Sequence, residues 1–297
     1  MDKLIAIVGP NASGKSSLSV ELALRFGAEI VSADSRQVFR GLDLGSGKIS
    51  PEGMKGVKHH LIDVAEPGDF FSMADFQRLA YAAIDGITAR GKLPMLVGGT
   101  GLYVESVVKG YELSDKMPDL SYRDELEKLA TPELYGMLTQ KLPGIEIDKN
   151  NRNRVMRALE KLHDGDDTVP GAKVRYDTLT LGVSWDRETL KTRIDERLMR
   201  RNAEGMIREV ETLRQNGVSD EFLLKLGLEY RYITEYLRGE WVSEDEMLSE
   251  LGLAIKRFAK RQMTWFRRDK SIRWLDMGGD PLAEAAGLIE SFIDRGQ

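Results

Sequence analysis

Short apolar runs alternate with amphipathic stretches along the first hundred residues of the chain. The runs at residues 4–8, 30–33 and 94–97 have the length of buried strands. The stretches at 15–26 and 72–90 are expected to be helices, and the second opens with the capping pair Ser72 and Asp75. This alternation predicts an α/β fold in which helices cover a parallel sheet.

The pattern changes between residues 114 and 175, where polar, proline-punctuated sequence with helical character replaces the strands. One helix is expected at "TPELYGML", with Thr131 as its cap and Pro132 at its first position. Another is expected over "NNRNRVMRALEKLHDG", ended by Gly165. "TLTLGVSW" and "SIRWLDM" then indicate two later strands. We therefore predict a core domain of residues 1–113 and 176–297, interrupted by a helical insertion domain over 114–175.

Composition narrows the class of protein. The 297 residues are 41% hydrophobic and 31% charged, which is typical of a globular protein with a sizeable core. No stretch approaches the about 20 apolar residues of a membrane span, and the first run is too short for a signal peptide. We expect a cytoplasmic protein with no membrane contact. The absence of cysteine excludes disulfides and thiolate chemistry, and three histidines do not indicate a histidine-built metal site.

The segment between the first predicted strand and helix reads "GPNASGKS", which matches the phosphate-loop pattern G-x-x-x-x-G-K-[ST]. Backbone N–H groups of such a loop and of the following helix N-terminus form a cradle for anions. Lys15 adds a positive charge, and the hydroxyl of Ser16 is placed to ligate Mg²⁺. The candidate phosphate-binding residues are Gly9, Asn11, Ala12, Ser13, Gly14, Lys15 and Ser16.

Polar residues follow two other predicted strands. The strand at 94–97 runs into Gly-Gly-Thr, without the acid that an NTP-hydrolysing enzyme uses there to hold its metal. Asp34 follows the strand at 30–33 and can act as a general base, a Mg²⁺ ligand or a helix cap. Thr100 can donate its hydroxyl to a phosphate or reacting group, or cap the next helix. Because carboxyl ends of parallel strands share one edge, both residues are expected near the phosphate loop.

Arginines recur on one face of a predicted helix in "LKTRIDERLMRRNAEGM". Arg193 and Arg197 lie four residues apart, and Arg200 and Arg201 follow one turn later. An arginine that reaches the phosphates would stabilise charge on a leaving group. The alternative is an ordinary solvated helix face.

Positive charge is also concentrated elsewhere, although the formal net charge is −5. "NRNRVMR" places Arg154 and Arg157 on one side of a helix, and residues 256–273 hold eight Lys and Arg side chains against one acid. The second stretch includes Trp265 and Phe266, and cations mixed with aromatic rings suit RNA bases and phosphates. The alternative is a salt-bridged helix whose aromatic rings face the core.

Six segments taken together resemble the motifs of tRNA dimethylallyltransferases in order and spacing, over nearly the whole chain. They are "GPNASGKSS", "SADSRQVFRGLDLGSGK", "HHLIDV", "GGTGLYV", "RIDER" and "AKRQMTWFRR". The resemblance implies a P-loop NTPase-like core of the bacterial type, with Mg²⁺ as cofactor. It also implies transfer of a dimethylallyl group from dimethylallyl diphosphate to N6 of the adenosine 3′ of the anticodon, with release of diphosphate. We expect a monomer whose partner is the anticodon stem-loop of tRNA.

The resemblance also implies roles for individual residues. The phosphate loop would hold the diphosphate, Asp34 would be the general base, and Arg197 would contact the leaving diphosphate. Thr100 matches a hydroxyl near the reacting centre. The residues that match tRNA contacts are Asp34, Ser35, Arg36, Gln37, Asn153, Arg154, Arg157, Lys260, Arg261, Gln262, Trp265 and Arg267.

The chain departs from the family pattern at three places. Glu229 in "GLEYRY" stands where a glycine is common, Ser46-Gly47 replaces Thr-Ala, and Phe39 replaces Tyr. Two other classes of function compete with tRNA prenyl transfer: an adenylate isopentenyltransferase or P-loop small-molecule kinase, and a phosphate-binding RNA-interaction protein without catalysis. An enzyme that acts on a free nucleotide or small molecule has little use for the insertion and the basic aromatic stretch. A binding protein without catalysis leaves the joint presence of Asp34, Thr100 and Arg197 unexplained.

Overall fold

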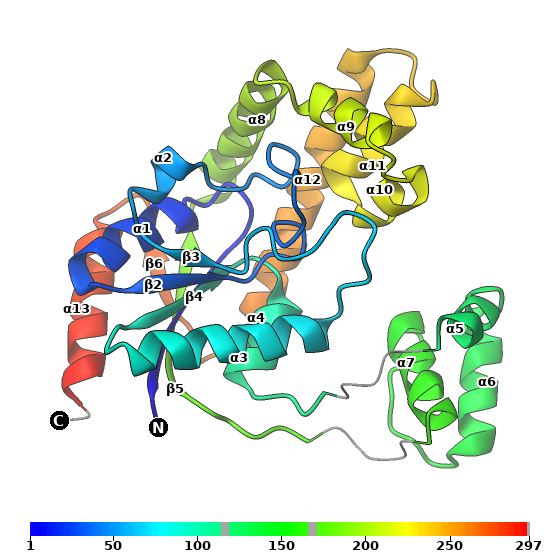
Figure 1. Ribbon diagram of the computed structural model, residues 1–297, viewed down its shortest axis with the longest axis horizontal. Coiled ribbons are helices and arrows are strands. Elements are labelled where there is room, and N and C mark those ends of the chain that lie inside the picture. The colour runs from blue at the N-terminus through cyan, green and yellow to red at the C-terminus, as the bar shows by residue number, and fades with distance from the viewer. Residues whose placement is uncertain (114–118, 166–170, 296–297) are drawn as a thin grey trace. The chain divides into compact units, whose positions relative to one another are not determined.

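The computed structural model describes residues 1–113, 119–165 and 171–295 (Figure 1). The chain forms two compact units, one of Met1–Tyr111 with Lys173–Gln297 and the other of Glu112–Ala172. Residue 114, the predicted start of the insertion, lies outside the described residues.

A parallel sheet of six strands lies at the centre of the first unit, in the order β3-β2-β4-β1-β5-β6 (Figure 1). The strands are β1 (Lys3–Val8), β2 (Glu29–Ser32), β3 (His59–His60), β4 (Pro94–Gly98), β5 (Asp177–Ser184) and β6 (Arg273–Asp276). The α/β class with a parallel sheet is therefore confirmed, and each predicted strand is present. β3, a strand of two residues, was not predicted, since it has no apolar pattern of its own.

Helices cover both faces of this sheet. The helices of the first unit are α1 (Lys15–Phe26), α2 (Pro51–Met54), α3 (Met73–Ala89), α4 (Gly101–Val108), α8 (Arg187–Ala203), α9 (Met206–Gln215), α10 (Asp220–Leu226), α11 (Leu228–Leu237), α12 (Glu244–Phe266) and α13 (Pro281–Asp294). On one face α1 packs beside α13, and on the other α3 packs beside α4. The sheet is thus enclosed as its continuous apolar strands require.

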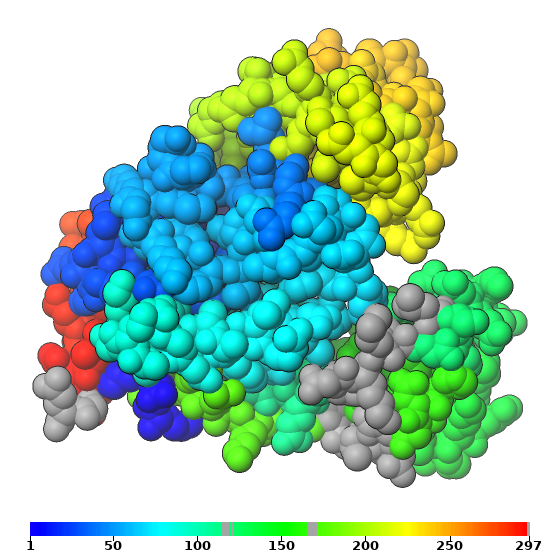
Figure 2. Space-filling view, in the orientation of Figure 1, coloured from blue at the N-terminus to red at the C-terminus, as the bar shows by residue number. Residues whose placement is uncertain are grey.

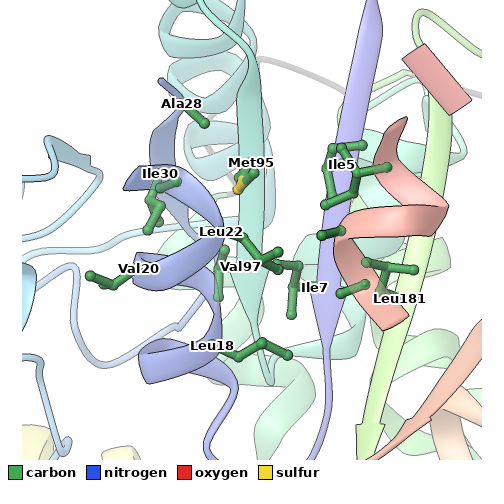
Figure 3. Packing of buried hydrophobic residues seen from close by; sticks show 14 of the residues in the cluster. Ile5, Ile7, Leu18, Val20, Leu22, Ala28, Ile30, Met95, Val97 and Leu181 are labelled. Carbon is green, nitrogen blue, oxygen red and sulfur yellow. The ribbon is translucent and has the colours of Figure 1, made fainter. Parts of the chain in front are cut away.

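The residues of β1 alternate between these two cores. Ile5 and Ile7 join the core under α1, where Figure 3 shows Ile7 and Val97 pointing toward Leu22. Leu4 belongs to the opposite core under α3 and α4, and it too is fully buried. A strand buried on both faces has no freedom to slip in register, because a shift of one residue would exchange the two faces.

A third core is formed by α8, α9, α10, α11 and α12. The segment after β2 packs into it, and Val38, Leu42 and Tyr230 are fully buried there. Figure 2 shows the blue atoms of this segment against the yellow-green atoms of α8 and α9. The segment that continues from the end of β2 is therefore held by helices far along the chain.

The predicted helix starts are confirmed at two places and wrong at one. α1 spans the predicted residues, and Ser72 and Asp75 form the predicted capping box of α3. In α6 (Thr131–Lys141) the cap is Ala130, whose N–H donates to the Glu133 carboxylate at 2.7 Å, so Thr131 is already helical. Alanine has no side-chain oxygen that could accept a hydrogen bond from the first turn. Here the Glu133 carboxylate accepts one from the backbone N–H of the cap residue, which is the other half of a capping box.

The second unit is a small helical bundle with its own core. It consists of α5 (Leu120–Glu127), α6 and α7 (Arg152–His163), packed around Leu134, Leu138, Val155 and Leu159. Asn151 caps α7 by accepting a hydrogen bond from the Arg154 N–H at 3.2 Å.

Glu29 is a buried carboxylate at the first position of β2. Its side chain is 4% exposed, and it contacts His60 Nε2 at 2.7 Å, Arg90 Nη2 at 2.6 Å and Lys92 Nζ at 3.0 Å. Burial alone would raise the pKa of Glu29, but hydrogen bonds from His60, Lys92 and Arg90 outweigh burial and lower it from 4.5 to about 2. The ionised carboxylate therefore stabilises the folded protein above pH 4.5, and this contribution is lost as the pH falls toward 2.

We predict that Glu29→Gln lowers the free energy of unfolding by about 1–3 kcal/mol at pH 7, because the cationic partners lose a buried acceptor. The difference from wild type should shrink as the pH falls from 4.5 to 3, which urea unfolding at each pH measures. Glu290→Gln, which breaks an exposed pair with Arg25, is the control and should cost less than about 1 kcal/mol. A Glu29→Gln difference that does not change with pH would contradict the prediction.

Candidate active site

The phosphate loop lies between β1, a central strand, and α1. Gly14 is the N-cap of α1 with φ +88°, and as a glycine it has no side chain that could cap the first turn of the helix. The N–H groups of that turn are therefore available to an anion. At Gly9 a Cβ atom would lie 2.6 Å from Val183 Cγ2, so only glycine lets the loop pass this close to β5.

Lys15 and Ser16 line a cavity together with Asp34 and Arg197. The Lys15 ammonium also donates to the carbonyl of Pro10 at 3.3 Å. Apolar side chains form another part of the cavity wall: Ile30, Ile49, Ile62 and Val97. An adjoining cavity is lined by the phosphate loop and by charged side chains of α8, namely Arg193, Glu196, Arg197 and Arg200. The structure thus brings the phosphate loop, Asp34 and Arg197 together, and it places apolar surface beside them.

Thr100 lies at the N-cap position of α4, but its side chain does not cap that helix. The hydroxyl oxygen instead accepts a hydrogen bond from the Ser35 N–H at 3.1 Å. The neighbouring Asp34 carboxylate accepts one from the Arg36 N–H at 3.0 Å. The Thr100 hydroxyl thus does not cap α4 and instead joins the loop after β4 to the loop after β2.

Gln262 of α12 is buried and joins two loops of the site. Its Oε1 accepts from the Asn11 N–H at 2.9 Å, and its Nε2 donates to the Gly99 carbonyl at 2.9 Å. A Cβ atom at position 99 would lie 2.6 Å from that Nε2, so the close approach requires glycine. Gln262 thereby fixes the phosphate loop relative to the end of β4.

Three arginines of α8 face the loops around the site. Arg193 Nε donates to the Ala12 carbonyl at 3.0 Å, and Arg197 Nη2 donates to the Gly47 carbonyl at 3.0 Å. Arg201 is buried and donates to the carbonyls of Leu44 and Gly45. This face of α8 is therefore part of the site and is not a solvated face, whereas Arg200 is exposed.

Burial lowers the pKa values of two cations that line the cavity. It lowers the pKa of Lys15 to about 8, with Asp34 opposing the shift and Arg197 and Arg36 adding to it. Burial and the charge of Arg201 lower the pKa of Arg197 to about 10, although Glu229 and Asp34 oppose this. Positive groups held together out of water favour binding of an anion, which restores their preferred charged forms.

The basic stretch of α12 combines both interpretations of its sequence. Phe266 is buried and Trp265 is half-buried against the core under α4, as a structural helix predicts. The charged side chains of Lys260, Arg261 and Arg267 are nevertheless exposed. In the second unit the predicted basic side of α7 is exposed at Asn153, Arg154 and Arg157.

The donor atoms near the phosphate loop are compatible with Mg²⁺. The hydroxyl of Ser16 lines the cavity, and Mg²⁺ commonly uses few protein oxygens together with phosphates and water. Within residues 1–113, 119–165 and 171–295, no group of three His, Asp or Glu side chains forms a ready-made metal site. The helices in the described ranges are all too short or too polar to cross a membrane.

Some residues of the site carried no signal that the sequence analysis used. The isoleucines of the cavity wall are scattered over three segments and resemble ordinary core positions. Glu209 of α9 accepts hydrogen bonds from the N–H groups of Leu44 and Gly45, at 2.6 and 3.0 Å. A half-buried carboxylate that binds the backbone of a distant loop has no local sequence pattern. The departure at Glu229 was a usable signal, because it places a charged residue at an unexpected position.

A glycine-rich phosphate loop after a central strand of a parallel sheet defines a P-loop NTPase-like protein. The sequence model of the family described as "IPP transferase" matches residues 37–269. The chain is 44% identical to tRNA dimethylallyltransferase 2 of Pelobacter propionicus, over 96% of this chain and 93% of that protein. It is 39% identical to the tRNA dimethylallyltransferase of Geobacillus thermodenitrificans, over 98% and 95%. The chain therefore belongs to the IPP transferase family.

Solved structures agree with this assignment. The full-length tRNA isopentenylpyrophosphate transferase of Bacillus halodurans superimposes with a TM-score of 0.77 at 38% identity, covering 99% of this chain and 98% of that one. A eukaryotic dimethylallyltransferase described as acting on tRNA gives a TM-score of 0.77 at 25% identity, over 93% of this chain and 74% of that one. The P-loop NTPase-like fold expected from the sequence is thus confirmed.

We predict that Gln262→Leu weakens binding of inorganic diphosphate about tenfold and lowers the free energy of unfolding by about 1–3 kcal/mol. The reason is that the Asn11 N–H and the Gly99 carbonyl both lose their buried partner. Calorimetric titration and urea unfolding measure the two effects. Met263→Leu, one position along α12 and with neither hydrogen bond, is the control. Unchanged diphosphate affinity in folded Gln262→Leu would show that the cross-link does not hold the loop.

Proposed function

We propose that the protein transfers a dimethylallyl group from dimethylallyl diphosphate to N6 of the adenosine 3′ of the anticodon in tRNA, with release of diphosphate. The observation that carries this proposal is the shared cavity of Lys15, Asp34 and Arg197 with its apolar wall. It combines an anion cradle, a carboxylate base and space for a hydrocarbon group. Relatives named tRNA dimethylallyltransferase, alike over nearly their whole length, support the same function.

The phosphate loop holds the diphosphate of the donor. N–H groups at the start of α1, the Lys15 ammonium and the Arg197 guanidinium stabilise the charge that grows on the diphosphate as the carbon–oxygen bond breaks. Ser16 would hold Mg²⁺ on the diphosphate, where the ion supplies further charge neutralisation. The dimethylallyl group then lies against the apolar wall of the cavity, which includes Ile49 and Ile62.

Asp34 acts on the nucleophile. The exocyclic amine of adenine is a weak nucleophile, and a carboxylate that takes its proton as the new carbon–nitrogen bond forms raises its reactivity. The Ser35 N–H bonded to Thr100 and the Arg36 N–H bonded to Asp34 fix the loop that carries this carboxylate. Thr100 thus orients the base and lies at the edge of the reacting centre.

Binding of tRNA is assigned to exposed polar and basic side chains. On α7 these are Asn153, Arg154 and Arg157, and on α12 they are Lys260, Arg261 and Arg267. Contacts from Ser35 and Gln37 would place the adenosine, which must leave the anticodon-loop stack to meet the donor. Arg36 and Gln262 are buried with protein partners, and Trp265 is half-buried, so we assign all three to positioning. We further propose that the insertion domain is a tRNA-contacting element, and that the enzyme works as a cytoplasmic monomer.

Labelled dimethylallyl diphosphate, incubated with the protein and unmodified tRNA, should give labelled tRNA with the label on the adenosine next to the anticodon. Parallel reactions contain AMP as acceptor, or γ-labelled ATP with small acceptors. Label found only in AMP would identify an adenylate isopentenyltransferase, and transfer from ATP would identify a kinase. Either result would overturn the proposed function.

Asp34→Asn separates chemistry from binding in this assay. The variant keeps the shape of the side chain and loses the proton acceptor, so transfer should fall at least about a hundredfold. Affinity for tRNA, measured by fluorescence anisotropy, should change less than about threefold. Equal losses in transfer and tRNA affinity would assign Asp34 to binding.

The salt dependence of tRNA affinity tests the basic face of α7. Each lost phosphate contact lowers the slope of log affinity against log salt by about 0.7–0.9. We therefore predict a smaller slope for Arg154→Ala and for Arg157→Ala, from titrations between low and physiological salt. Arg187→Ala, at the start of α8, is the control and should keep the wild-type slope. An unchanged slope in both α7 variants would place the phosphate contacts elsewhere.

A further inference from the structure

Glu229 of α11 is buried between two arginines of distant segments. Its Oε2 accepts from Arg36 Nη1 at 2.5 Å, and its Oε1 accepts from Arg201 Nη1 at 3.0 Å. The exposed fractions of the three side chains are 2% for Glu229 and 9% for each arginine. A buried carboxylate between two guanidinium groups forms a strongly coupled unit, in which removal of one member leaves an uncompensated charge.

The carboxylate of Glu229 is ionised in this environment. Burial would raise its pKa, but the charges of Arg36 and Arg201 outweigh burial and lower it to about 2. Burial would also lower the pKa of Arg36, and the carboxylates of Glu229 and then Asp34 reverse this and raise it. Arg36 therefore interacts with two carboxylates, one in the core and one in the active-site cavity.

The backbone of Arg36 is joined to Asp34, since its N–H donates to Asp34 Oδ1 at 3.0 Å, while its guanidinium is held by Glu229. The other charged or titratable groups that act on Asp34 are Lys15 of α1, Arg197 of α8 and Tyr103 of α4. Besides Glu229, the carboxylate that acts on the charge of Arg36 is that of Asp34.

Arg201 extends the unit to the loop that meets Arg197. Besides Glu229 it binds the carbonyls of Leu44 and Gly45, and two residues later the Gly47 carbonyl accepts from Arg197. A separate, smaller cavity is lined by Asn11, Ser46, Arg197, Arg201 and Glu229, and the first three of these residues also line the active-site cavity. The triad thus adjoins both the phosphate loop and the arginine that we assign to the leaving group.

Gly47 and Glu229 both contact arginines of α8. Gly47 has φ +65°, and a Cβ atom there would lie 2.1 Å from Arg197 Nη2, so the residue has to be glycine for Arg197 to reach its carbonyl. Glu229 binds Arg201, one turn further along the same helix. The two residues are therefore parts of one local arrangement around the arginines of α8.

We propose that Glu229 is a positioning residue for the transfer reaction. It keeps the Arg36 guanidinium away from the Asp34 carboxylate, so that Asp34 remains free to accept the proton of the amine, and it fixes Arg201 on the loop that meets Arg197. This inference rests on the proposed function, in which Asp34 is the base.

The pH dependence of transfer tests this role. In Glu229→Gln we expect the Arg36 guanidinium to turn toward Asp34, and a cation beside a carboxylate makes it a weaker base. The acid limb of kcat against pH, at saturating tRNA and dimethylallyl diphosphate, should move down by about one pH unit. The plateau should fall about tenfold, as expected for a weaker base. Glu229→Asp, which keeps the charge, should restore the wild-type limb.

Glu209→Gln is the matched control. Glu209 holds the loop that Arg201 also binds, because it accepts hydrogen bonds from the N–H groups of Leu44 and Gly45. It also accepts one from the Tyr230 hydroxyl at 2.9 Å. It does not bind Arg36. If Glu229 only stabilised this loop, both Gln variants would lower thermal stability and neither would move the acid limb. A folded Glu229→Gln variant with the wild-type limb, or an equal displacement in Glu209→Gln, would overturn the inference.

A double variant covers the case in which Glu229→Gln does not fold. Glu229→Gln with Arg36→Gln removes both charges of the pair, which costs less stability than removing one. Since no guanidinium remains to approach Asp34, its acid limb should coincide with the wild-type limb, and a displaced limb would overturn the inference. The wild-type protein in the same assay separates the two proposals, because no transfer to tRNA by wild type would reject the proposed function itself.

Discussion

β1 is buried on both faces, and each element of the active site takes its position from this strand. The parallel neighbours β4 and β5 pair with β1 in register, so the loops after these strands emerge at one edge of the sheet. β2 pairs with β4 and brings Asp34 to the same edge. The phosphate loop, the base and Thr100 therefore meet at one edge of the sheet although they are far apart in the sequence. Ligand sites of open parallel sheets are generally formed in this way.

Charge balance is the second constraint, and it acts between elements that are far apart in the chain. Cations of α1 and α8 surround the cavity, where burial lowers the pKa values of Lys15 and Arg197. Two carboxylates, Asp34 and Glu229, oppose this shift in Arg197. One faces the cavity and the other is enclosed in the core, and Arg36 lies between them. This division allows one carboxylate to be structural while the other remains available for proton transfer.

Local patterns were sufficient for every strand except β3, for α1 and for the capping box of α3, because each depends on neighbouring residues in the sequence. They failed at the start of α6, where Thr131 is not the cap and the Glu133 carboxylate accepts a hydrogen bond from the Ala130 N–H. For Thr100 and for the aromatic residues of α12, the sequence left two interpretations open. The structure shows that the Thr100 side chain does not cap α4, and that in α12 Phe266 is buried while Arg267 beside it is exposed.

The sequence by itself determined the α/β class, the phosphate loop and the family, because these depend on periodicity and on short motifs whose spacing is local. Only the tertiary structure decided the partners of the charged residues. The hydrogen bonds of Gln262 to Asn11 and Gly99 were not predicted, and Glu229 had no explanation until Arg36 and Arg201 were found on either side of it. The physical reason is that a buried polar group needs a hydrogen-bonding partner that is close in space. That partner can lie anywhere along the chain, so the local sequence does not indicate it.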